Sequence, residues 1–400
     1  MKTLRNLPFA LALALLPCVS SSAEPATTMT TAVTTAATTV PAPLDWRHTI
    51  KPGRFLSSGA GVWVSPEIEP PFPFDTLIYH WKLLPERGEG FRLYVQTRFT
   101  GTGAETPWLY AGYWGEVKPH EGVREEAAKF DGGKLDQDTV ILDREARSFR
   151  FKVVSEGSRR LAHPPLIGAI ATLTTPTAEI AARHAREPRS TDRGTTLVLD
   201  VPLCAQQDTG GNRLPDRCQS AALTSAMEYF GKRIPLEQTI CFTTDPEYKV
   251  FGIWPRTIAA AHEHGFDAYL DRFRDWDAVR EAVAQNKVIL CSIRMPKGLD
   301  YIAPPYPSIG GHIVALCGVT PDGRVIVTDS ALTAKGNGHL LQWLQPDFEK
   351  IWMGTKGGVG MVICPPERSQ MKTVKDLPPF PRPIPSMPAK DEPTTGAATP

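Results

Sequence analysis

A cysteine, a histidine and an aspartate occur in this chain in the order that a cysteine hydrolase uses. Cys218 opens a segment in which small or apolar residues recur every fourth position, and this spacing predicts an amphipathic helix that ends at Gly231. Cys218 then lies in the first turn of that helix. Unpaired backbone N–H groups and the positive end of the helix dipole favour a thiolate there, and the thiolate is the form that attacks a carbonyl carbon.

The candidate base and the residue that would orient it lie on two predicted strands. His312 follows Gly310 and Gly311, whose missing side chains leave room for a partner, and it begins an apolar run that predicts a buried strand. A Pro-Asp-Gly turn at residues 321–323 leads into a second apolar run that ends at Asp329. The two runs therefore predict a hairpin that returns Asp329 toward His312. An Asp-Gly turn puts both side chains on one face, although not directly opposite each other.

A glutamine precedes the cysteine. Gln206 ends the stretch Val-Pro-Leu-Cys-Ala-Gln at residues 201–206. Its side-chain amide N–H could donate to the oxyanion of a tetrahedral intermediate, and such a donor lowers the barrier to acyl transfer.

The stretch from Val201 to Ile363 resembles the bacteriocin-processing (double-glycine) peptidase-like family of the papain clan, in its stand-alone secreted branch. The motifs that carry the resemblance, in chain order, are Val-Pro-x-x-x-Gln206, Cys218-x-x-Ala, Phe251-Gly-Ile-Trp-Pro, Gly-Gly-His312 and Val-x-Asp329. The resemblance implies an α+β papain-like cysteine peptidase domain. It also implies roles: Cys218 as nucleophile, His312 as general base, Asp329 as the orienting residue and Gln206 as the oxyanion donor.

Two observations leave alternatives open. Many relatives have Gly or Ser-Pro after the nucleophile where this chain has Gln219-Ser220, which leaves substrate preference and activity in question. A disulfide between Cys204 and Cys218 could close the polar loop 208–216 and make Cys218 structural. The first hypothesis is thus a secreted cysteine peptidase that hydrolyses peptide bonds. The alternative is a catalytically inactive binding protein with a peptidase fold, or another amide or thioester hydrolase or acyltransferase.

Composition and spacing argue against several other classes. The formal net charge is +1, from 44 basic and 43 acidic residues, so neither nucleic acid nor an anionic membrane is expected as the main partner. His262 and His264 have no zinc-type pattern around them, and the acidic loop at 208–216 lacks the spacing of a calcium loop. We therefore expect no metal and no cofactor, and a peptide or protein as substrate.

Both ends of the chain read as segments outside a folded domain. Residues 1–23 have the charged start, short apolar run and small-residue site of a signal peptide, which predicts a secreted or periplasmic protein. No apolar run approaches the roughly 20 residues needed to span a bilayer. Residues 24–44 are a Thr/Ala/Pro-rich linker, and residues 366–400 form a Pro-rich tail predicted to be disordered.

Short alternating runs with Gly- and Pro-rich turns predict an all-β sandwich domain over residues 45–175. Part of it looks like the β-domain that precedes the peptidase in secreted relatives. An Arg- and Ala-rich connector (176–195) then leads to the peptidase domain (196–365). Six aromatic residues of the β-domain could line a groove for a carbohydrate, cell-wall or peptide ligand or could instead fill its core: Trp63, Trp81, Trp108, Tyr110, Tyr113 and Trp114.

Overall fold

The computed structural model describes residues 45–82, 89–115, 127–156, 169–174, 196–245, 251–305, 307–332 and 338–377. All of them belong to one compact unit, residues 42–400. The predicted signal peptide, linker and connector lie outside the described residues, as does the predicted tail from residue 378 onward. Among the described ranges, every helix is too short or too polar to cross a lipid bilayer.

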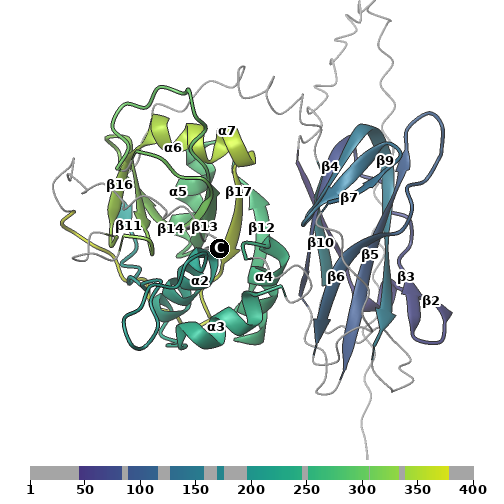
Figure 1. Cartoon of the computed structure of the whole chain (residues 1–400), viewed down its shortest axis with the longest axis horizontal. Helices are drawn as coiled ribbons and strands as arrows, with labels where there is room; N and C mark the ends of the chain where they lie inside the picture. Colours follow the sequence, from purple (N-terminus) through teal and green to yellow (C-terminus); the bar gives the residue numbers. More distant parts are fainter. Residues whose placement is uncertain are drawn as a thin grey trace, which may run out of the picture. The chain divides into compact units, whose positions relative to one another are not determined.

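The described residues of the first part of this unit form ten strands and one short 3-10 helix, η1 (Pro52–Arg54), and the strands are joined by hydrogen bonds into one sheet (Figure 1). The strands are β1 (Trp46–Ile50), β2 (Leu56–Gly59), β3 (Val62–Val64), β4 (Phe74–Lys82), β5 (Gly90–Phe99), β6 (Leu109–Gly115), β7 (Ala127–Phe130), β8 (Gly133–Asp136), β9 (Thr139–Ser155) and β10 (Ala169–Thr174). The beginning of β9 pairs with β4 and β8, and its remainder pairs with β3 and β5. This long strand therefore connects the whole sheet, while the division into the two layers of a sandwich stays a prediction.

The aromatic side chains of this sheet mostly fill its core. Trp63, Trp81, Tyr113 and Trp114 are buried, whereas Trp108 and Tyr110 are half-buried. The period-two pattern explains this outcome, because alternate residues of a strand must face inward. Four of the six aromatic residues considered for a groove are thus core residues.

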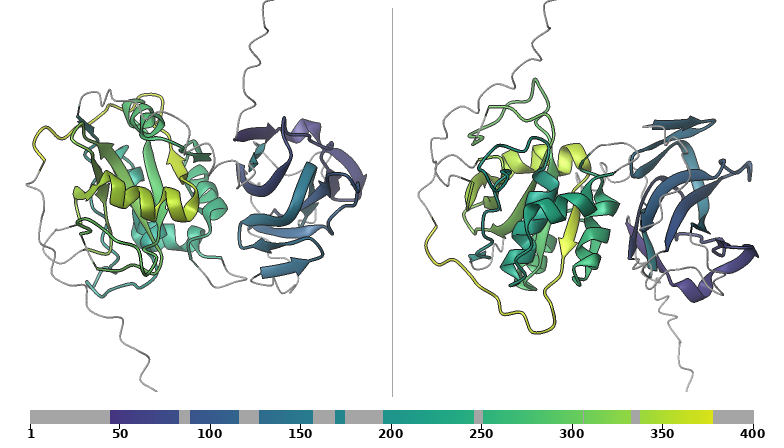
Figure 2. Two further views of the ribbon diagram at one scale, coloured as in Figure 1. Left: turned by 90° about the horizontal axis from the view of Figure 1, so that it is seen from above. Right: turned by 60° about the horizontal axis from the view of Figure 1, so that its bottom comes forward.

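The second part of the unit has a seven-stranded antiparallel sheet with helices beside it (Figure 1, Figure 2). Its strands are β11 (Leu197–Val198), β12 (Ala268–Arg272), β13 (Val288–Ile293), β14 (His312–Val319), β15 (Arg324–Thr328), β16 (Leu341–Leu344) and β17 (Val359–Ile363). Its helices are α2 (Cys218–Tyr229), α3 (Leu236–Thr243), α4 (Trp254–Glu263), α5 (Trp276–Ala284), α6 (Gln345–Ile351) and α7 (Met353–Lys356). The strand order is β12-β17-β13-β14-β15-β16, and β11 pairs with β14. Every residue of β14 is buried, so this strand forms the centre of the domain.

Helix α2 differs from the amphipathic helix that the sequence predicts. Ten of its 12 residues are buried, because it packs against β14 as well as α3 and α4. Small side chains allow this close approach, and the buried hydroxyls pair with those of α3: Ser220 Oγ lies 2.6 Å from Thr243 Oγ1, and Thr224 donates to Thr239 at 2.9 Å. A helix that is enclosed on all sides holds its first residue in a fixed position.

The chain after β17 is hydrogen-bonded to the domain beyond the boundary that the sequence predicts. The backbone N–H of Asp200 donates to Lys372 O, and that of Val374 donates to Val198 O, each at 2.9 Å. Tyr229 Oη also accepts from the backbone N–H of Lys372 at 3.1 Å. The boundary expected at residue 365 therefore lies too early, because backbone pairing of this kind leaves no signal in composition.

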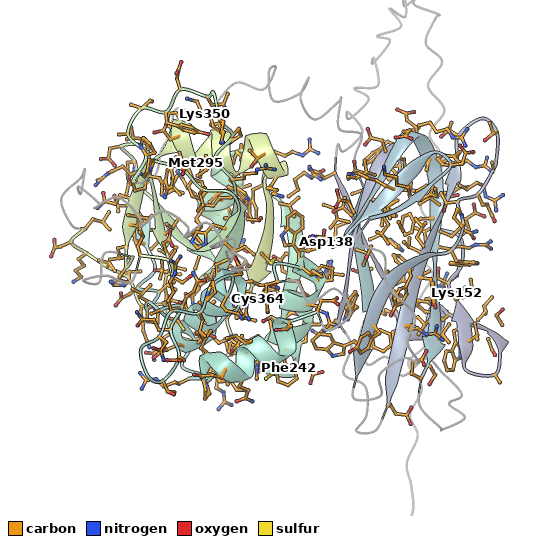
Figure 3. The ribbon with its side chains drawn as sticks, viewed as in Figure 1. Asp138, Lys152, Phe242, Met295, Lys350 and Cys364 are labelled. Carbon is orange, nitrogen blue, oxygen red and sulfur yellow. The ribbon has the colours of Figure 1, made fainter. Side chains whose placement is uncertain are left out.

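Helix α4 is held by buried polar contacts with the first sheet. Its first backbone N–H, that of Trp254, donates at 3.0 Å to the Oδ2 atom of Asp138. Asp138 lies between β8 and β9 and is labelled in Figure 3. Two residues further along α4, Arg256 donates to the carbonyl oxygen of Tyr113 at 3.1 Å and forms a 3.0 Å ion pair with Asp245. The side chains of this ion pair are 7% and 1% exposed, so water does not screen them.

We expect Arg256→Met to lower the free energy of unfolding by about 3–5 kcal/mol, because it leaves the buried carboxylate of Asp245 without its cation. Denaturant unfolding monitored by tryptophan fluorescence measures this loss. Arg233→Met is the matched control, since the Arg233 side chain is 86% exposed and its pair with Glu228 is worth about 0–1 kcal/mol. Equal effects of the two substitutions would contradict the structural role of Arg256.

Candidate active site

Cys218 is the first residue of α2, as predicted, and borders a cavity. No side chain caps this helix end, which leaves its first backbone N–H groups available. The sulfur of Cys218 accepts hydrogen bonds from the backbone N–H groups of Gln219 and Ile313, and it is hydrogen-bonded to the ring of His312. The N-terminus of α2 and the start of β14 thus meet at this sulfur.

His312 and Asp329 form a short hydrogen bond with each other. The Nε2 atom of His312 lies 2.6 Å from Oδ1 of Asp329. The side chains are 6% and 0% exposed, respectively. Asp329 Oδ1 also accepts from the backbone N–H of Ala331 at 2.9 Å, which fixes the carboxylate. Because Nε2 is engaged by Asp329, Nδ1 is the ring nitrogen that remains for Cys218.

The hairpin that brings these two side chains together contains an irregularity. Its loop spans residues 321–323, with Thr320 N–H donating to Arg324 O at 2.9 Å. Near the loop, Gly318 lies opposite Ile326. Beyond a bulge at Cys317, the register has shifted by one residue. Neither the loop length nor the bulge follows from the Pro-Asp-Gly signal.

The bulge determines the face of the hairpin on which Asp329 lies. Continued without it, the register near the loop would place Asp329 opposite Ala315, on the face away from His312. The shifted register pairs Thr328 with Ala315, and its continuation by one residue puts Asp329 at the level of Val314, which shares the face of His312. The predicted common face is therefore correct, but the bulge produces it.

The pKa values of the cysteine and the histidine are shifted toward an ion pair. Burial raises the pKa of the Cys218 thiol, but the hydrogen bond and charge of His312 and the two backbone N–H groups outweigh it, so the net pKa is lowered. Burial lowers the pKa of His312, but the charge and hydrogen bond of Asp329, together with Cys218, raise it to about 10. Both shifts favour a thiolate beside an imidazolium.

Gln206 lies next to this cluster and is 8% exposed. Its Oε1 atom accepts from the backbone N–H of Arg217, the residue before Cys218, at 3.0 Å. Its Nε2 atom donates to Ser330 Oγ, one residue after Asp329, at 3.1 Å. A side-chain amide has two N–H donors, and the bond to Ser330 uses one of them. The structure thus brings all four predicted site residues to one place.

Gln219, where the chain departs from many relatives, does not face the cavity. It is buried, and its Nε2 atom donates to Ile253 O at 2.9 Å and to Thr257 Oγ1, while its Oε1 atom accepts from the backbone N–H of Gly252. The residue after Cys218 therefore fixes the turn that leads into α4. This turn contains the Phe-Gly-Ile-Trp-Pro motif, and its Trp254 lines the cavity.

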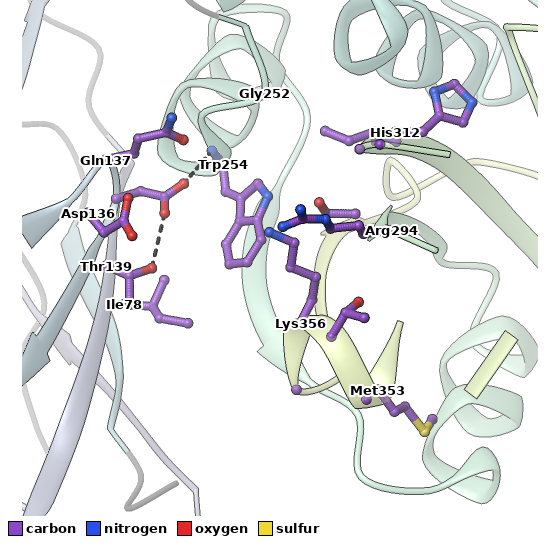
Figure 4. A pocket seen from close by; sticks show the side chains of 18 of the residues that line it. Ile78, Asp136, Gln137, Thr139, Gly252, Trp254, Arg294, His312, Met353 and Lys356 are labelled. Carbon is purple, nitrogen blue, oxygen red and sulfur yellow. Dashed lines mark hydrogen bonds between the residues drawn. The ribbon is translucent and has the colours of Figure 1, made fainter. Parts of the chain in front are cut away.

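Cys218 and His312 open onto a cavity of about 1080 Å³ (Figure 4). Gly310 and Gly311 border it, and nothing lies within 4 Å of the position that a Cβ atom would take at either of them. Two cations that the sequence analysis did not single out, Arg294 and Lys356, also line it. No local pattern marks them, since only the fold brings them to the cavity that Cys218 borders.

The alternative interpretations of cysteine and histidine residues can be compared with the structure. Cys204 and Cys218 are both free thiols, and burial raises the pKa of Cys204 to about 12. His262 Nδ1 pairs with Phe266 O at 2.9 Å, and burial lowers the pKa of His262 to about 4. In the described ranges, no three His, Cys, Asp or Glu side chains cluster in a way that could hold a metal ion.

The part of the chain that contains this site matches a known protein family. Residues 198–358 match the Peptidase_C39 like family. This match supports the resemblance inferred from Val201 to Ile363 and, with it, a peptidase. It spans the described parts of the second sheet from β11 to α7, including Cys218, His312 and Asp329.

Three solved structures are similar to part of the chain. The peptidase domain of Streptococcus ComA, a bi-functional ABC transporter involved in a quorum sensing pathway, is 14% identical over 42% of this chain and 99% of its own, with a TM-score of 0.30. A double glycine motif protease from an AMS/PCAT transporter, in complex with the leader peptide, is 14% identical over 43% and 100% (TM-score 0.28). A C39-like peptidase from Bacillus anthracis is 16% identical over 44% and 100% (TM-score 0.31). No curated protein matches the chain.

We expect iodoacetamide to alkylate Cys218 at a pH well below that at which a free cysteine reacts, because His312 stabilises the thiolate. His312 keeps its proton until the pH rises through about 10, so this advantage should persist across the neutral range and fade above it. His312→Ala should move the alkylation curve to higher pH, and Asp329→Asn should move it by less.

Alkylation rates mapped to individual peptides across the pH range test this expectation. Exposed Cys241 in the same sample is the internal control, and its curve should be the same in all three proteins. Superimposable Cys218 curves for the wild type and His312→Ala would contradict the ion pair.

Proposed function

We propose that the C-terminal domain is a cysteine peptidase that hydrolyses peptide bonds, with Cys218 as nucleophile, His312 as general base and Asp329 as the residue that orients the imidazole. The observation that supports this proposal best is the continuous chain of hydrogen bonds from the Cys218 sulfur through the His312 ring to the buried Asp329 carboxylate. It lies at a cavity and within the segment that matches a peptidase family.

The proposed reaction proceeds in two halves. The Cys218 thiolate attacks the scissile carbonyl carbon, and the negative oxygen of the tetrahedral intermediate accepts from the backbone N–H of Cys218 and the unused amide N–H of Gln206. When the C–N bond breaks, the His312 imidazolium gives its proton to the leaving amine and becomes neutral. His312 then takes a proton from water, whose oxygen attacks the thioester, and the Cys218 sulfur leaves as the thiolate while His312 is again protonated.

Asp329 has a separate role in this cycle. Its carboxylate accepts from Nε2 of His312, which keeps Nδ1 directed at the sulfur and stabilises the imidazolium. The low exposure of both side chains strengthens the interaction.

We also propose that the protein is exported and that the β-structure at residues 45–175 is a sandwich that serves as an accessory domain. Residues 1–23 support export through their signal-peptide pattern. A carbohydrate or cell-wall ligand of the accessory domain stays a hypothesis, and half-buried Trp108 and Tyr110 are the aromatic residues left to bind it. Intact mass of the exported protein should give a mature chain that begins near Glu24. An unprocessed chain in the cytoplasm would overturn this part of the proposal.

Turnover of peptide substrates tests the catalytic roles. Cys218→Ala should abolish turnover. Gln206→Glu keeps the acceptor for the Arg217 backbone N–H but removes the amide donors, so it should lower kcat by about 10²–10³ while Cys218 still reacts with iodoacetamide.

The matched control is Gln285→Glu, an exposed position at the end of α5, which should leave turnover unchanged. If Cys218→Ala retains turnover, the cysteine peptidase assignment is wrong. If the wild type binds peptides without cleaving them, the inactive binding protein becomes the better explanation.

A further inference from the structure

We propose that the cavity beside Cys218 selects substrates that carry an acidic group, which Arg294 and Lys356 bind through its carboxylate. This inference rests on the proposed peptidase function and adds a substrate class to it: peptides with an aspartate or glutamate side chain near the bond that is cut.

The two cations are presented by one rigid part of the domain. Arg294 directly follows β13, and its backbone N–H donates to Ile351 O at 3.0 Å. Lys356 ends α7, and its backbone N–H donates to Trp352 O at 2.8 Å. Ile351 and Trp352 are consecutive and fully buried, so both cations are tied to the same fixed segment of the core.

Neither cationic side chain has a hydrogen-bond or ion-pair partner in the parts of the chain that the structure describes. The other cations that line the cavity are engaged. Arg272 pairs with Asp45 at 3.3 Å, and Lys350 donates to the carbonyl oxygen of Asp300. The charges of Arg294 and Lys356 are therefore available to a ligand that enters the cavity. Arg294 is exposed and Lys356 is half-buried, so both can be reached.

The acidic residues that line the same cavity make their contacts with groups other than Arg294 and Lys356. Asp138 accepts from the backbone N–H of Trp254, and Asp136 pairs with Lys134 at 2.8 Å. Glu349 accepts from the indole N–H of Trp276 at 3.3 Å. Asp216 adjoins the cationic side chain of Arg217, whose pKa it influences. None of these four carboxylates pairs with Arg294 or Lys356 in the described part of the chain.

The chemistry of these two cations suits a carboxylate on a short apolar stem. A guanidinium group can bind both oxygens of a carboxylate, and an ammonium group beside it adds a second charge-assisted hydrogen bond. Figure 4 shows Arg294 and Lys356 directed toward the part of the cavity that Trp254 lines. The indole offers an apolar surface for the methylene groups of an aspartate or glutamate side chain.

Two alkylating reagents test the inference without knowledge of the natural substrate. Iodoacetate is a carboxylate and iodoacetamide is its neutral analogue, and both react at the Cys218 sulfur. The ratio of their rates reports the positive charge of the cavity. The double variant Arg294→Gln/Lys356→Gln should lower this ratio about threefold to tenfold at low ionic strength, and added salt should reduce the difference.

The matched control, Lys297→Gln/Arg233→Gln, removes the same net charge from two exposed positions outside the cavity and should leave the ratio at the wild-type value. Arg294→Lys/Lys356→Arg keeps both charges and should keep most of the ratio. A ratio that is equal in the wild type and the Gln variant would overturn the inference. The proposed function would survive that result, because it depends on the absolute rate at low pH and on peptide turnover.

Paired peptides that differ only by Glu and Gln near the cut bond provide the second measurement. We expect the wild type to cleave the Glu peptide with the higher kcat/KM, mainly through KM. The charge-reversed variant Arg294→Glu/Lys356→Glu should instead favour a Lys peptide. Equal preference for Glu and Gln in the wild type would again overturn the inference while leaving peptidase activity established.

Discussion

The contact between the His312 imidazole and the Asp329 carboxylate stabilises a positive charge on a buried ring, where the absence of water would otherwise favour the neutral form. An imidazolium as buried as that of His312 loses its proton unless an anion compensates for the missing water, and Asp329 supplies that anion at 2.6 Å. The protonated ring then lowers the pKa of the Cys218 thiol. The ionisation state of the whole site thus depends on one carboxylate that never meets solvent. The surrounding fold holds the side chains of Cys218, His312 and Asp329 at a fixed distance from one another.

The β14–β15 hairpin and the packing of helix α2 fix the positions of these side chains. On one side, the bulge at Cys317 sets the face of the hairpin on which Asp329, the residue directly after β15, lies. On the other side, α2 is enclosed by its neighbours and cannot move Cys218 without disturbing buried hydroxyl pairs. Gln219 then joins α2 to the turn before α4, and Asp138 of the first sheet accepts from the first N–H of that helix. The wall that carries Trp254 is therefore fixed from both parts of the protein.

Much of the candidate site could be predicted from the sequence because its signals are local. Runs of adjacent residues predict the small-residue helix after Cys218, the apolar strand after His312 and the turn before Asp329. The features that were missed depend on distant residues. The burial of α2 on every side reflects packing against β14, and the bulge reflects strand register. Arg294 and Lys356 meet only through the segment at residues 351–352, and the pairing of residues 372–374 with 198–200 leaves no compositional trace.

That last pairing has a mechanical consequence. The chain enters the second sheet at residues 198–200 and leaves it at residues 372–374, and backbone hydrogen bonds join the two passages. A tension applied to the segments before and after the domain would load this junction first. Cys218, His312 and Asp329 are not part of this pairing. Because residue 374 pairs with residue 198, the two ends of the domain lie side by side, and a circular permutation that joins them would leave Cys218, His312 and Asp329 in place.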